Sequence, residues 1–286
     1  MRQSTMITVI IPSYNEEKVI SRTLKTMTAG ALPGELDVIV VCNGCTDDTV
    51  SVAGNFGPPV RVIGTGLAGK TVALNLGDKA ATSFPRVYAD ADVHLTIDAI
   101  RNLANRLETG DVLAVAPIAN IDLKDCSWLV RTYYEIRSLL PSGREGIGGS
   151  GVYALSEAGR NRFSEFPKLT ADDGYVRIQF KPEERETLTS VSSTVFAPRT
   201  VWDLITTKTR SQYGSLELAS RFPALWKNKG DSNDAALVEL FRHPLLWHKL
   251  LVYCLVTIIA KRRARIRMLT GNPAWLRDET SRVAAE

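Results

Sequence analysis

The chain has 286 residues, of which 44% are hydrophobic and 23% are charged, and its net charge is +4 at pH 7. This balance excludes a disordered or fibrous protein and suffices for one large α/β domain with a short appendage. Four cysteines in this length do not make a disulfide framework, and the N-terminus lacks a basic region followed by an apolar run, so we expect a reducing, cytoplasmic setting.

The first half alternates short β-branched runs with helix-like stretches, which is typical of a parallel sheet covered by helices. Apolar residues at helical spacing predict a helix over residues 16–27. Asp47 and Asp48 favour the start of another helix, because carboxylates are stabilised at the N-terminal end of the helix dipole. The predicted strands cover residues 6–11, 37–41, 60–63, 87–89 and 112–116.

The second half is less regular. We expect a helix over residues 125–139, a short strand and a helix from Ser156, an extended segment over 181–198 and a largely helical one over 200–225. Between the first helix and the short strand lies a glycine-rich loop, and glycine at this density marks backbone that turns tightly or approaches a ligand closely. The glycines of this loop are Gly143, Gly146, Gly148, Gly149 and Gly151.

Two cysteines, Cys42 and Cys45, form a C-x-x-C pair, which can be redox-active or half of a zinc site. The sequence has no second such pair and no histidine nearby. We therefore interpret both as small residues at the junction of a strand and a loop.

Two carboxylates, Asp90 and Asp92, directly follow the predicted strand 87–89, where an open α/β sheet presents its ligands. Carboxylates one residue apart can both turn toward one hard cation. Mg²⁺ or Mn²⁺ held in this way keeps open positions for phosphate oxygens. The alternative interpretation is an ordinary acidic turn.

Six ordered motifs resemble those of the family 2 glycosyltransferases, which have the GT-A fold. The first two are Ile-Ile-Pro-Ser-Tyr-Asn-Glu-Glu at 10–17 and Ala-Asp-Ala-Asp at 89–92. The segment 40–49 resembles the second nucleotide loop of the family, and 69–77 is similar to its G-K-x-x-A-x-N-x-G segment. Residues 148–151 resemble the acceptor-side glycine loop, and 170–173 the acidic motif that contributes the catalytic base.

This resemblance implies an α/β protein of the GT-A class, with a Rossmann-like, mixed but mostly parallel sheet flanked by helices and a C-terminal apolar and basic helix. We expect a glycosyltransferase domain over 1–225, with a nucleotide-binding half over about 1–117 and an acceptor half over about 118–225. A membrane-associating helical tail would cover 226–286.

The resemblance also assigns donor-binding residues. Pro12, Tyr14 and Glu16 would line the nucleotide pocket, although Glu16 could instead be an acid at a helix N-terminus. Lys70 would meet phosphate or order the nucleotide loop, with an ordinary surface lysine as the alternative. Asn75 would brace that loop or lie on a helix surface.

The sequence departs from the family at Cys42 and Asn43, where an acidic pair is common. A carboxylate at this place typically accepts a hydrogen bond from the nucleotide base, and Asn43 can still accept one through its carbonyl. The resemblance therefore favours uridine only modestly over guanosine in the donor.

By the register of the motif, Asp173 matches the base that removes the proton of the acceptor hydroxyl. Asp172 would orient the loop or hydrogen-bond the acceptor, and Asp90 and Asp92 would anchor the metal. The alternative is a pair of N-cap acids before a helix over 174–180. The expected acceptor-binding residues are Gly149, Ser150 and Gly151.

A basic segment at 208–214 is similar to one that precedes an aromatic residue and a glycine in processive members of the family. Its Arg210 would clamp the leaving pyrophosphate. The tryptophan expected beside this arginine is missing, and Tyr213 lies nearby instead. This difference indicates a non-processive enzyme.

The end of the chain is basic, with nine Lys/Arg and three Asp/Glu over 241–286. Residues 245–260 are almost wholly apolar, and the basic cluster 261–267 follows them. Because this stretch is shorter than the roughly 20 residues that a span requires, we predict an interfacial or re-entrant helix on anionic headgroups. A core helix and a true span are the alternatives. No nucleic-acid partner is expected.

Together, these expectations describe an inverting glycosyltransferase that uses Mg²⁺ or Mn²⁺ and a nucleotide-sugar donor, with UDP-sugar favoured. Its acceptor would be a hydroxyl of a lipid-linked or cell-envelope glycan, and the enzyme would be cytoplasmic and peripheral on the inner face of the cell membrane. A nucleotidyltransferase is one rival, but it usually carries a glycine-rich loop with a basic residue after the first strand, where this chain has Pro12 to Glu16. An inactive scaffold of the same fold is another.

Overall fold

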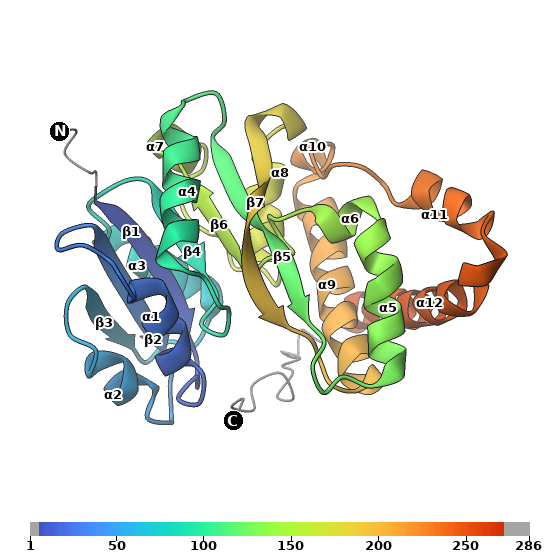
Figure 1. Ribbon diagram of the computed structural model, residues 1–286, viewed down its shortest axis with the longest axis horizontal. Helices are drawn as coiled ribbons and strands as arrows, with labels where there is room; N and C mark the ends of the chain where they lie inside the picture. Colours follow the sequence, from blue (N-terminus) through green and yellow to red (C-terminus); the bar gives the residue numbers. More distant parts are fainter. Residues whose placement is uncertain (1–5, 272–286) are drawn as a thin grey trace.

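The computed structural model describes residues 6–271. Its centre is one seven-stranded sheet with the order β3-β2-β1-β4-β6-β5-β7, and helices cover the sheet (Figure 1). All strand pairs are parallel except those that β6 makes with β4 and β5. The predicted mixed, mostly parallel sheet is therefore confirmed. The strands are β1 Ile7–Ser13, β2 Leu36–Asn43, β3 Val60–Thr65, β4 Arg86–Ala89, β5 Ala114–Asp122, β6 Val152–Leu155 and β7 Arg185–Phe196.

The helices of the first half connect the parallel strands, and those of the second half lie partly on the sheet and partly beyond β7 (Figure 1). They are α1 Ile20–Thr28, α2 Thr49–Gly54, α3 Lys70–Ala80, α4 Ile97–Glu108, α5 Trp128–Leu139, α6 Pro141–Arg144 and α7 Glu157–Arg160. After these follow α8 Asp172–Ile178, η1 Pro182–Glu184, α9 Val201–Arg221, α10 Pro223–Trp226, α11 Asp234–Phe241, η2 Pro244–Leu246 and α12 Trp247–Thr270.

Several boundaries differ from the prediction, and three of the differences have a clear structural reason. The helix expected over 16–27 begins at Ile20, because Asn15 has a positive φ of 53° and the chain first forms a loop after β1. The strand expected to end at residue 116 continues to Asp122, since its outer part pairs with β7. The helix expected over 200–225 ends at Arg221, and Pro223 then starts the short α10.

Two apolar clusters cover the two faces of the sheet. One joins alternate residues of β1 and β2 to α1 and α4, and the other joins the remaining alternate residues to α3 and α8. This division follows from the period of two in a strand, which sends successive side chains to opposite faces. The sheet is thereby held rigidly, and the loops at its carboxyl edge have a fixed base.

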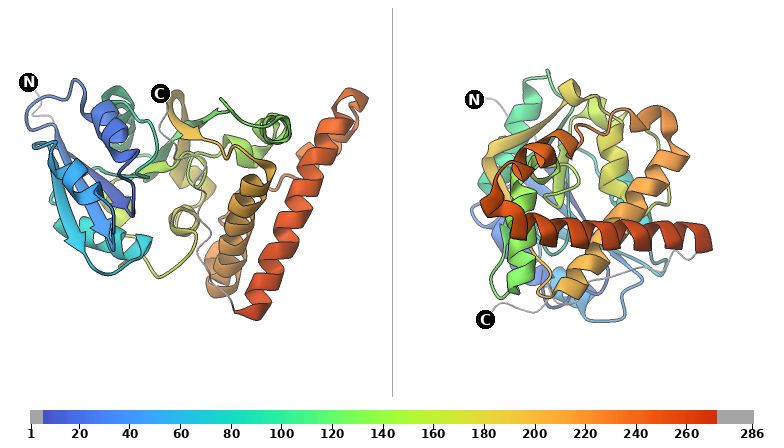
Figure 2. Two further views of the ribbon diagram at one scale, coloured as in Figure 1. Left: turned by 90° about the horizontal axis from the view of Figure 1, so that it is seen from below. Right: turned by 90° about the vertical axis from the view of Figure 1, so that its right-hand side faces the viewer.

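A third cluster lies outside the sheet, where α5, α9 and α12 pack together. Leu250, Tyr253 and Val256 form the buried side of α12, and Figure 2 shows this helix alongside α9. The segment 244–270 is long and apolar enough to cross a membrane by length and composition alone. The end of the predicted tail, residues 272–286, lies outside the described residues.

Candidate active site

The loops after β1 and β2 are joined by hydrogen bonds between side chains and backbone. The carbonyl oxygen of the Asn15 side chain accepts a hydrogen bond from the backbone N–H of Thr46 at 2.8 Å. Glu17 accepts one from the N–H of Asp48 at 3.1 Å, and the N–H of Glu16 donates to the Thr49 hydroxyl at 2.7 Å. Because β1 and β2 are adjacent and parallel, their carboxyl ends present these loops at one edge of the sheet.

Of the residues predicted to line the nucleotide pocket, Tyr14 is exposed, whereas Pro12 and Glu16 are buried. Glu16 precedes α1 by a loop and is therefore not an acid in the first turn of a helix. All three lie at or just beyond the carboxyl end of β1.

Asn43, the last residue of β2, holds two loops together. The side-chain Nδ2 of Asn43 donates to the backbone carbonyl of Ser13 at 2.8 Å. Its side-chain Oδ1 accepts a hydrogen bond from the N–H of Gly69 at 2.9 Å. Both polar atoms are thus engaged with backbone, so the structure gives Asn43 a bracing role between β1 and the start of α3. Beside it, Cys42 is buried, and burial raises the pKa of its thiol to about 12. That value opposes thiolate chemistry.

Lys70, the first residue of α3, is half-buried and lies between two carboxylates. Its Nζ is 2.7 Å from Oδ1 of Asp90 and 3.1 Å from Oδ2 of Asp172. Burial alone would lower the pKa of Lys70, but the carboxylates of Asp172 and Asp90 raise it above its ordinary value, so the ammonium stays charged. The alternative of an ordinary surface lysine is wrong.

Asp172 and Asp173 lie in the first turn of α8. The N-cap alternative required both to lie before the helix, and it is therefore wrong. Asp172 is 5% exposed, and burial raises the pKa of its carboxyl to about 6 against the opposite effect of Lys70. Asp173 is more open, and its Oδ1 accepts a hydrogen bond from the N–H of Gly174 at 2.6 Å. The two adjacent carboxylates therefore have different partners.

The predicted glycine loop passes between these groups. A Cβ placed on Gly148 would lie 3.8 Å from Oδ2 of Asp173, and one placed on Gly151 would lie 3.3 Å from Oδ2 of Asp90. The N–H of Asp90 donates to the carbonyl of Gly151 at 2.9 Å. The loop thus brings Asp90 and Asp173 to the same region of the molecule.

Ser150 requires a correction. Its side chain is fully buried, and its hydroxyl lies 2.9 Å and 2.7 Å from the backbone carbonyl oxygens of Gly146 and Val152, to one of which it donates its hydrogen. A side chain used in this way cannot contact an acceptor. Ser150 shapes the loop, and Gly149 and Gly151 remain partly exposed on it.

Asp92 has a different neighbour from Asp90. Burial lowers the pKa of the Arg22 guanidinium, and the carboxylate of Asp92 acts against that shift, so the two groups are close. The Arg22 guanidinium lies 4.1 Å from the ring centre of Phe196, at the end of β7. Within residues 6–271 no three acidic, histidine or cysteine side chains gather as a metal site.

Arg210 lies on α9, which passes behind the acidic loop. A Cβ on Gly214 would lie 2.6 Å from Cβ of Ala171, so α9 and the start of α8 are in direct contact. Glu217 accepts a hydrogen bond from the N–H of Thr170 at 2.9 Å. Asn75, on α3, exchanges hydrogen bonds with the backbone of Phe166, and it therefore braces this later segment rather than the nucleotide loop.

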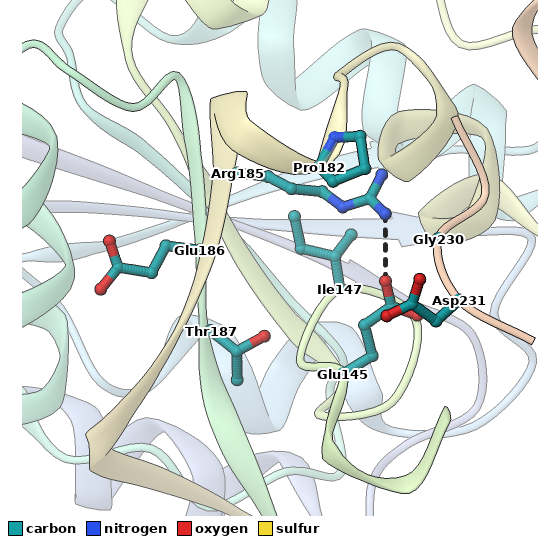
Figure 3. A pocket seen from close by; sticks show the side chains of 8 residues that line it. All are labelled: Glu145, Ile147, Pro182, Arg185, Glu186, Thr187, Gly230 and Asp231. Atoms are coloured by element: carbon teal, nitrogen blue, oxygen red, sulfur yellow. Dashed lines mark hydrogen bonds and ion pairs between the residues drawn. The ribbon is translucent and has the colours of Figure 1, made fainter. Parts of the chain in front are cut away.

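A small cavity lies apart from the carboxylates (Figure 3). Two of its charged groups form an ion pair, since Glu145 lies 3.1 Å from Arg185, and Glu145 also lies 2.7 Å from Arg177. Arg185 also donates to three backbone carbonyls. This arrangement connects β7 to the segment before α11.

Tyr153 was not predicted to belong to the site. It lies in β6 directly after the glycine loop and stacks on Tyr88 with the ring centres 4.9 Å apart. Burial raises its pKa strongly, and the carboxylates of Asp172, Asp173 and Asp90 raise it further. The phenol therefore stays neutral beneath these acids. In the sequence, the only indication that Tyr153 belongs to the site is its position directly after the glycine-rich loop.

The sheet order and the carboxylates at the end of a central strand define a protein of the GT-A class. The sequence profile described as "Glycosyl transferase family 2" matches residues 8–153. The chain therefore belongs to glycosyl transferase family 2, whose members depend on nucleotide sugars. This membership removes the nucleotidyltransferase alternative.

A curated relative, 4,4'-diaponeurosporenoate glycosyltransferase of Staphylococcus aureus, is 35% identical over 107 residues, which make up 36% of this chain and 28% of that protein. Among solved structures, a mannosyltransferase from Pyrobaculum calidifontis in complex with GDP-Man and Mn²⁺ has a TM-score of 0.68 at 17% identity. The alignment covers 95% of this chain and 89% of that one. Glucosyl-3-phosphoglycerate synthase from Mycobacterium tuberculosis, in complex with Mn²⁺, UDP-glucose and phosphoglyceric acid, has a TM-score of 0.55 at 21% identity, with 75% and 79% covered. At these identities the structural likeness shows the fold.

Proposed function

We propose that this protein is an inverting, metal-dependent glycosyltransferase that moves a sugar from a nucleotide-diphosphate donor, with UDP-sugar favoured, to an acceptor hydroxyl. The observation that carries the proposal is the position of Lys70 between Asp90 and Asp172. This contact joins the end of β4, where a donor phosphate would lie, to the acidic loop where an acceptor would lose its proton.

Asp173 serves as the base in this proposal. Asp172 is buried against Lys70, whereas Asp173 is more open and lies against Gly148 of the glycine loop. A carboxylate in that place can remove the proton of a hydroxyl as the hydroxyl oxygen bonds to the anomeric carbon. Direct displacement of the diphosphate from the opposite side inverts the anomeric configuration, and such a base typically contributes about 10²- to 10⁴-fold.

Asp90 and Asp92 fit a divalent cation of the magnesium or manganese kind. They supply only carboxylate oxygens, which are hard ligands, and two of them leave room for phosphate oxygens. When bound, the cation neutralises charge on the diphosphate. Structural neighbours were solved with Mn²⁺ and a nucleotide sugar, which supports the same choice here.

The nucleotide would lie over the loops after β1 and β2. Tyr14 is exposed there and would contact the base, with Pro12 and Glu16 supporting its loop from below. Asn43 would act by bracing Gly69 and thus the start of α3, which carries Lys70. Arg210 would face the leaving pyrophosphate from α9.

The last helix supports a peripheral place on the inner face of the cell membrane. One side of α12 packs against α5 and α9, while large apolar residues on its other side face outward, as a helix lying in the interface requires. These exposed residues of α12 include Trp247, Leu251, Leu255 and Ile258. The basic cluster 261–267 follows them and would meet anionic headgroups. An enzyme held there would reach a lipid-linked or cell-envelope glycan.

The test is sugar transfer and hydrolysis with Mn²⁺ across UDP-, GDP- and dTDP-sugars, comparing the wild type with Asp92→Ala and Asp173→Asn. We expect both substitutions to abolish turnover, and Asp98→Asn to leave it unchanged, since the Asp98 side chain is 78% exposed and pairs with Arg101. Equal turnover in all four proteins would contradict the assigned roles. Wild-type inactivity toward every donor would support the inactive scaffold instead.

A further inference from the structure

A group of positive charges lies where α5 and α9 meet the glycine loop. Lys208 on α9 is half-buried, and its Nζ lies 5.6 Å and 5.3 Å from the ring centres of Tyr133 and Tyr134. The guanidinium of Arg137, one turn further along α5, is 6.0 Å from the ring centre of Tyr134. Both cations therefore gather over the same pair of aromatic rings, which attract positive charge through their faces.

In the part of the chain that the structure describes, these charges are not balanced by carboxylates. Within residues 6–271, neither Arg137 nor Lys208 forms an ion pair with a carboxylate. Burial lowers the pKa of Lys208 well below its ordinary value, and Arg137 and Arg210 lower it further. Cations held together in this way are costly to the fold, and such an arrangement is characteristic of a site that receives an anion.

The cluster borders the acceptor side of the active site. A terminal guanidinium nitrogen of Arg137 lies 3.9 Å from where a Cβ on Gly149 would be, and the adjacent Gly148 lies against Asp173. Along α9, Lys208 precedes Gly214, which packs on Ala171, by six residues, or about 9 Å at the rise of an α-helix. Asp90 lies at the other end of the loop, beside Gly151.

One of the two aromatic rings under the cations, that of Tyr133, packs against the last helix. Tyr253 of α12 stacks on Tyr133 with the ring centres 5.1 Å apart and the planes 21° from parallel. The rings therefore cannot turn away from the cations without disturbing α12. An anion bound here would lie between the acceptor loop and the helix whose outer face is apolar.

We propose that Arg137 and Lys208 bind a phosphate group carried by the acceptor, and thereby place the acceptor hydroxyl beside Asp173. This inference rests on the proposed transfer reaction and adds the chemical class of the acceptor. Phosphate is favoured because arginine and lysine together match its several oxygens with charge-assisted hydrogen bonds. The phosphate can belong to a soluble phosphomonoester or to a lipid headgroup, and both present the same group to the two side chains.

The test uses the full chain with Mg²⁺ and saturating UDP, so that the donor site is filled, and titrates inorganic phosphate and glycerol 1-phosphate by calorimetry. We expect affinity to fall about tenfold or more in Lys208→Met and in Arg137→Gln, and to be recovered in part by Lys208→Arg. Lys229→Met is the matched control, because Lys229 also lies over an aromatic ring, that of Trp226, but outside the cluster. Repeating the titration at alkaline pH in buffers of different ionisation enthalpy should show more proton uptake in the wild type than in Lys208→Met.

A second arm distinguishes the source of the phosphate. Binding to phosphatidylcholine vesicles with and without phosphatidic acid is compared between wild type and Lys208→Met. A loss specific to phosphatidic acid identifies a lipid phosphate, and a loss confined to the soluble ligands identifies a phosphomonoester. Unchanged phosphate affinity in both cluster variants overturns the proposal, as does a parallel fall in UDP affinity, which would place the cations on the donor. Donor hydrolysis is measured separately, so a failure of the transfer proposal would be recognised on its own.

Discussion

Lys70 and Asp172 join the two halves of the active site, with Nζ of the lysine 3.1 Å from Oδ2 of the aspartate. The lysine begins the helix after β3, and the aspartate begins α8 in the second half of the chain. Because the same ammonium also contacts Asp90, the proposed donor and acceptor regions share one half-buried charge. A change on either side is therefore felt on the other.

Replacing Lys70 tests this link. In Lys70→Met the carboxylates of Asp90 and Asp172 lose their shared cation, and we expect transfer to fall by about 10²-fold or more, as for other fixed charges at a reacting centre. Lys70→Arg should retain part of the activity. Steady-state turnover with the best donor is the measurement, and Lys18→Met, at an exposed position, is the control. Full activity in Lys70→Met would contradict the link.

The ionisation of Asp172 should be visible in the folded protein. Burial raises the pKa of its carboxyl from 3.8 to about 6, so the folded state holds a proton between these values that the unfolded state has released. The free energy of unfolding should therefore decrease as pH rises through this window. Carbon NMR of labelled aspartate should show a carboxyl titrating near pH 6 that is absent in Asp172→Asn. A corresponding titration below pH 4 would contradict this prediction.

Gly151 should not tolerate a side chain. A Cβ there would lie 2.5 Å from Cγ1 of Val93, and its φ is +68°. Gly110 has a φ of +80° with nothing within 4 Å, so Gly110→Ala serves as the control for backbone strain alone. We expect Gly110→Ala to cost about 1 kcal/mol of stability and Gly151→Ala about 1–3 kcal/mol more. Urea denaturation gives both values. Because Gly151 adjoins Asp90, we also expect donor turnover to fall in Gly151→Ala and to persist in Gly110→Ala.

Lys208 should lower the stability of the free protein. Its folded pKa lies well below 10.5, so the charged form is disfavoured in the fold at neutral pH. We therefore expect Lys208→Met to have a higher melting temperature than the wild type at pH 7. The wild type gains stability as pH rises from the folded pKa toward 10.5, so this difference should shrink on going to alkaline pH. Calorimetry at a series of pH values is the measurement, and a difference that does not change with pH would indicate a packing effect.

The outer face of α12 should govern membrane binding. Leu251 and Leu255 are 59% and 50% exposed, and the double substitution to Glu adds charge without disturbing the buried face of the helix. We expect binding to anionic vesicles to weaken about tenfold or more, since both burial of apolar area and attraction to headgroups are lost. Leu32→Glu, on a loop between α1 and β2 and 65% exposed, is the control. Co-sedimentation distinguishes the two, and equal binding would contradict the prediction.

Much of the fold followed from local sequence. Continuous apolar runs such as Val38 to Val41 predicted buried strands, and the placement of Asp90 and Asp92 after one of them predicted the edge at which ligands bind. These signals depend on neighbouring residues, so they can be read without knowing how the chain folds. The errors arose at element ends, where Asn15 takes a left-handed conformation and the paired β5 extends beyond its apolar residues.

The roles of several site residues needed the tertiary structure. The resemblance assigned Ser150 to acceptor binding, yet its hydroxyl forms hydrogen bonds within its own loop. Arg137 carried no motif at all, and its place beside Gly149 depends on how the glycine loop lies against α5. Long-range packing decides which side chains meet.

The sequence by itself thus determined the family, the parallel strands and the carboxylates at their ends, because strand pattern and motif order are local properties of the chain. Only the tertiary structure decided that Lys70 pairs with Asp172, that Lys208 lies near Arg137 and Arg210, and that α12 packs by one side and exposes the other. These are contacts between elements distant in sequence, and their free energy depends on burial and charge that exist only once the elements have packed.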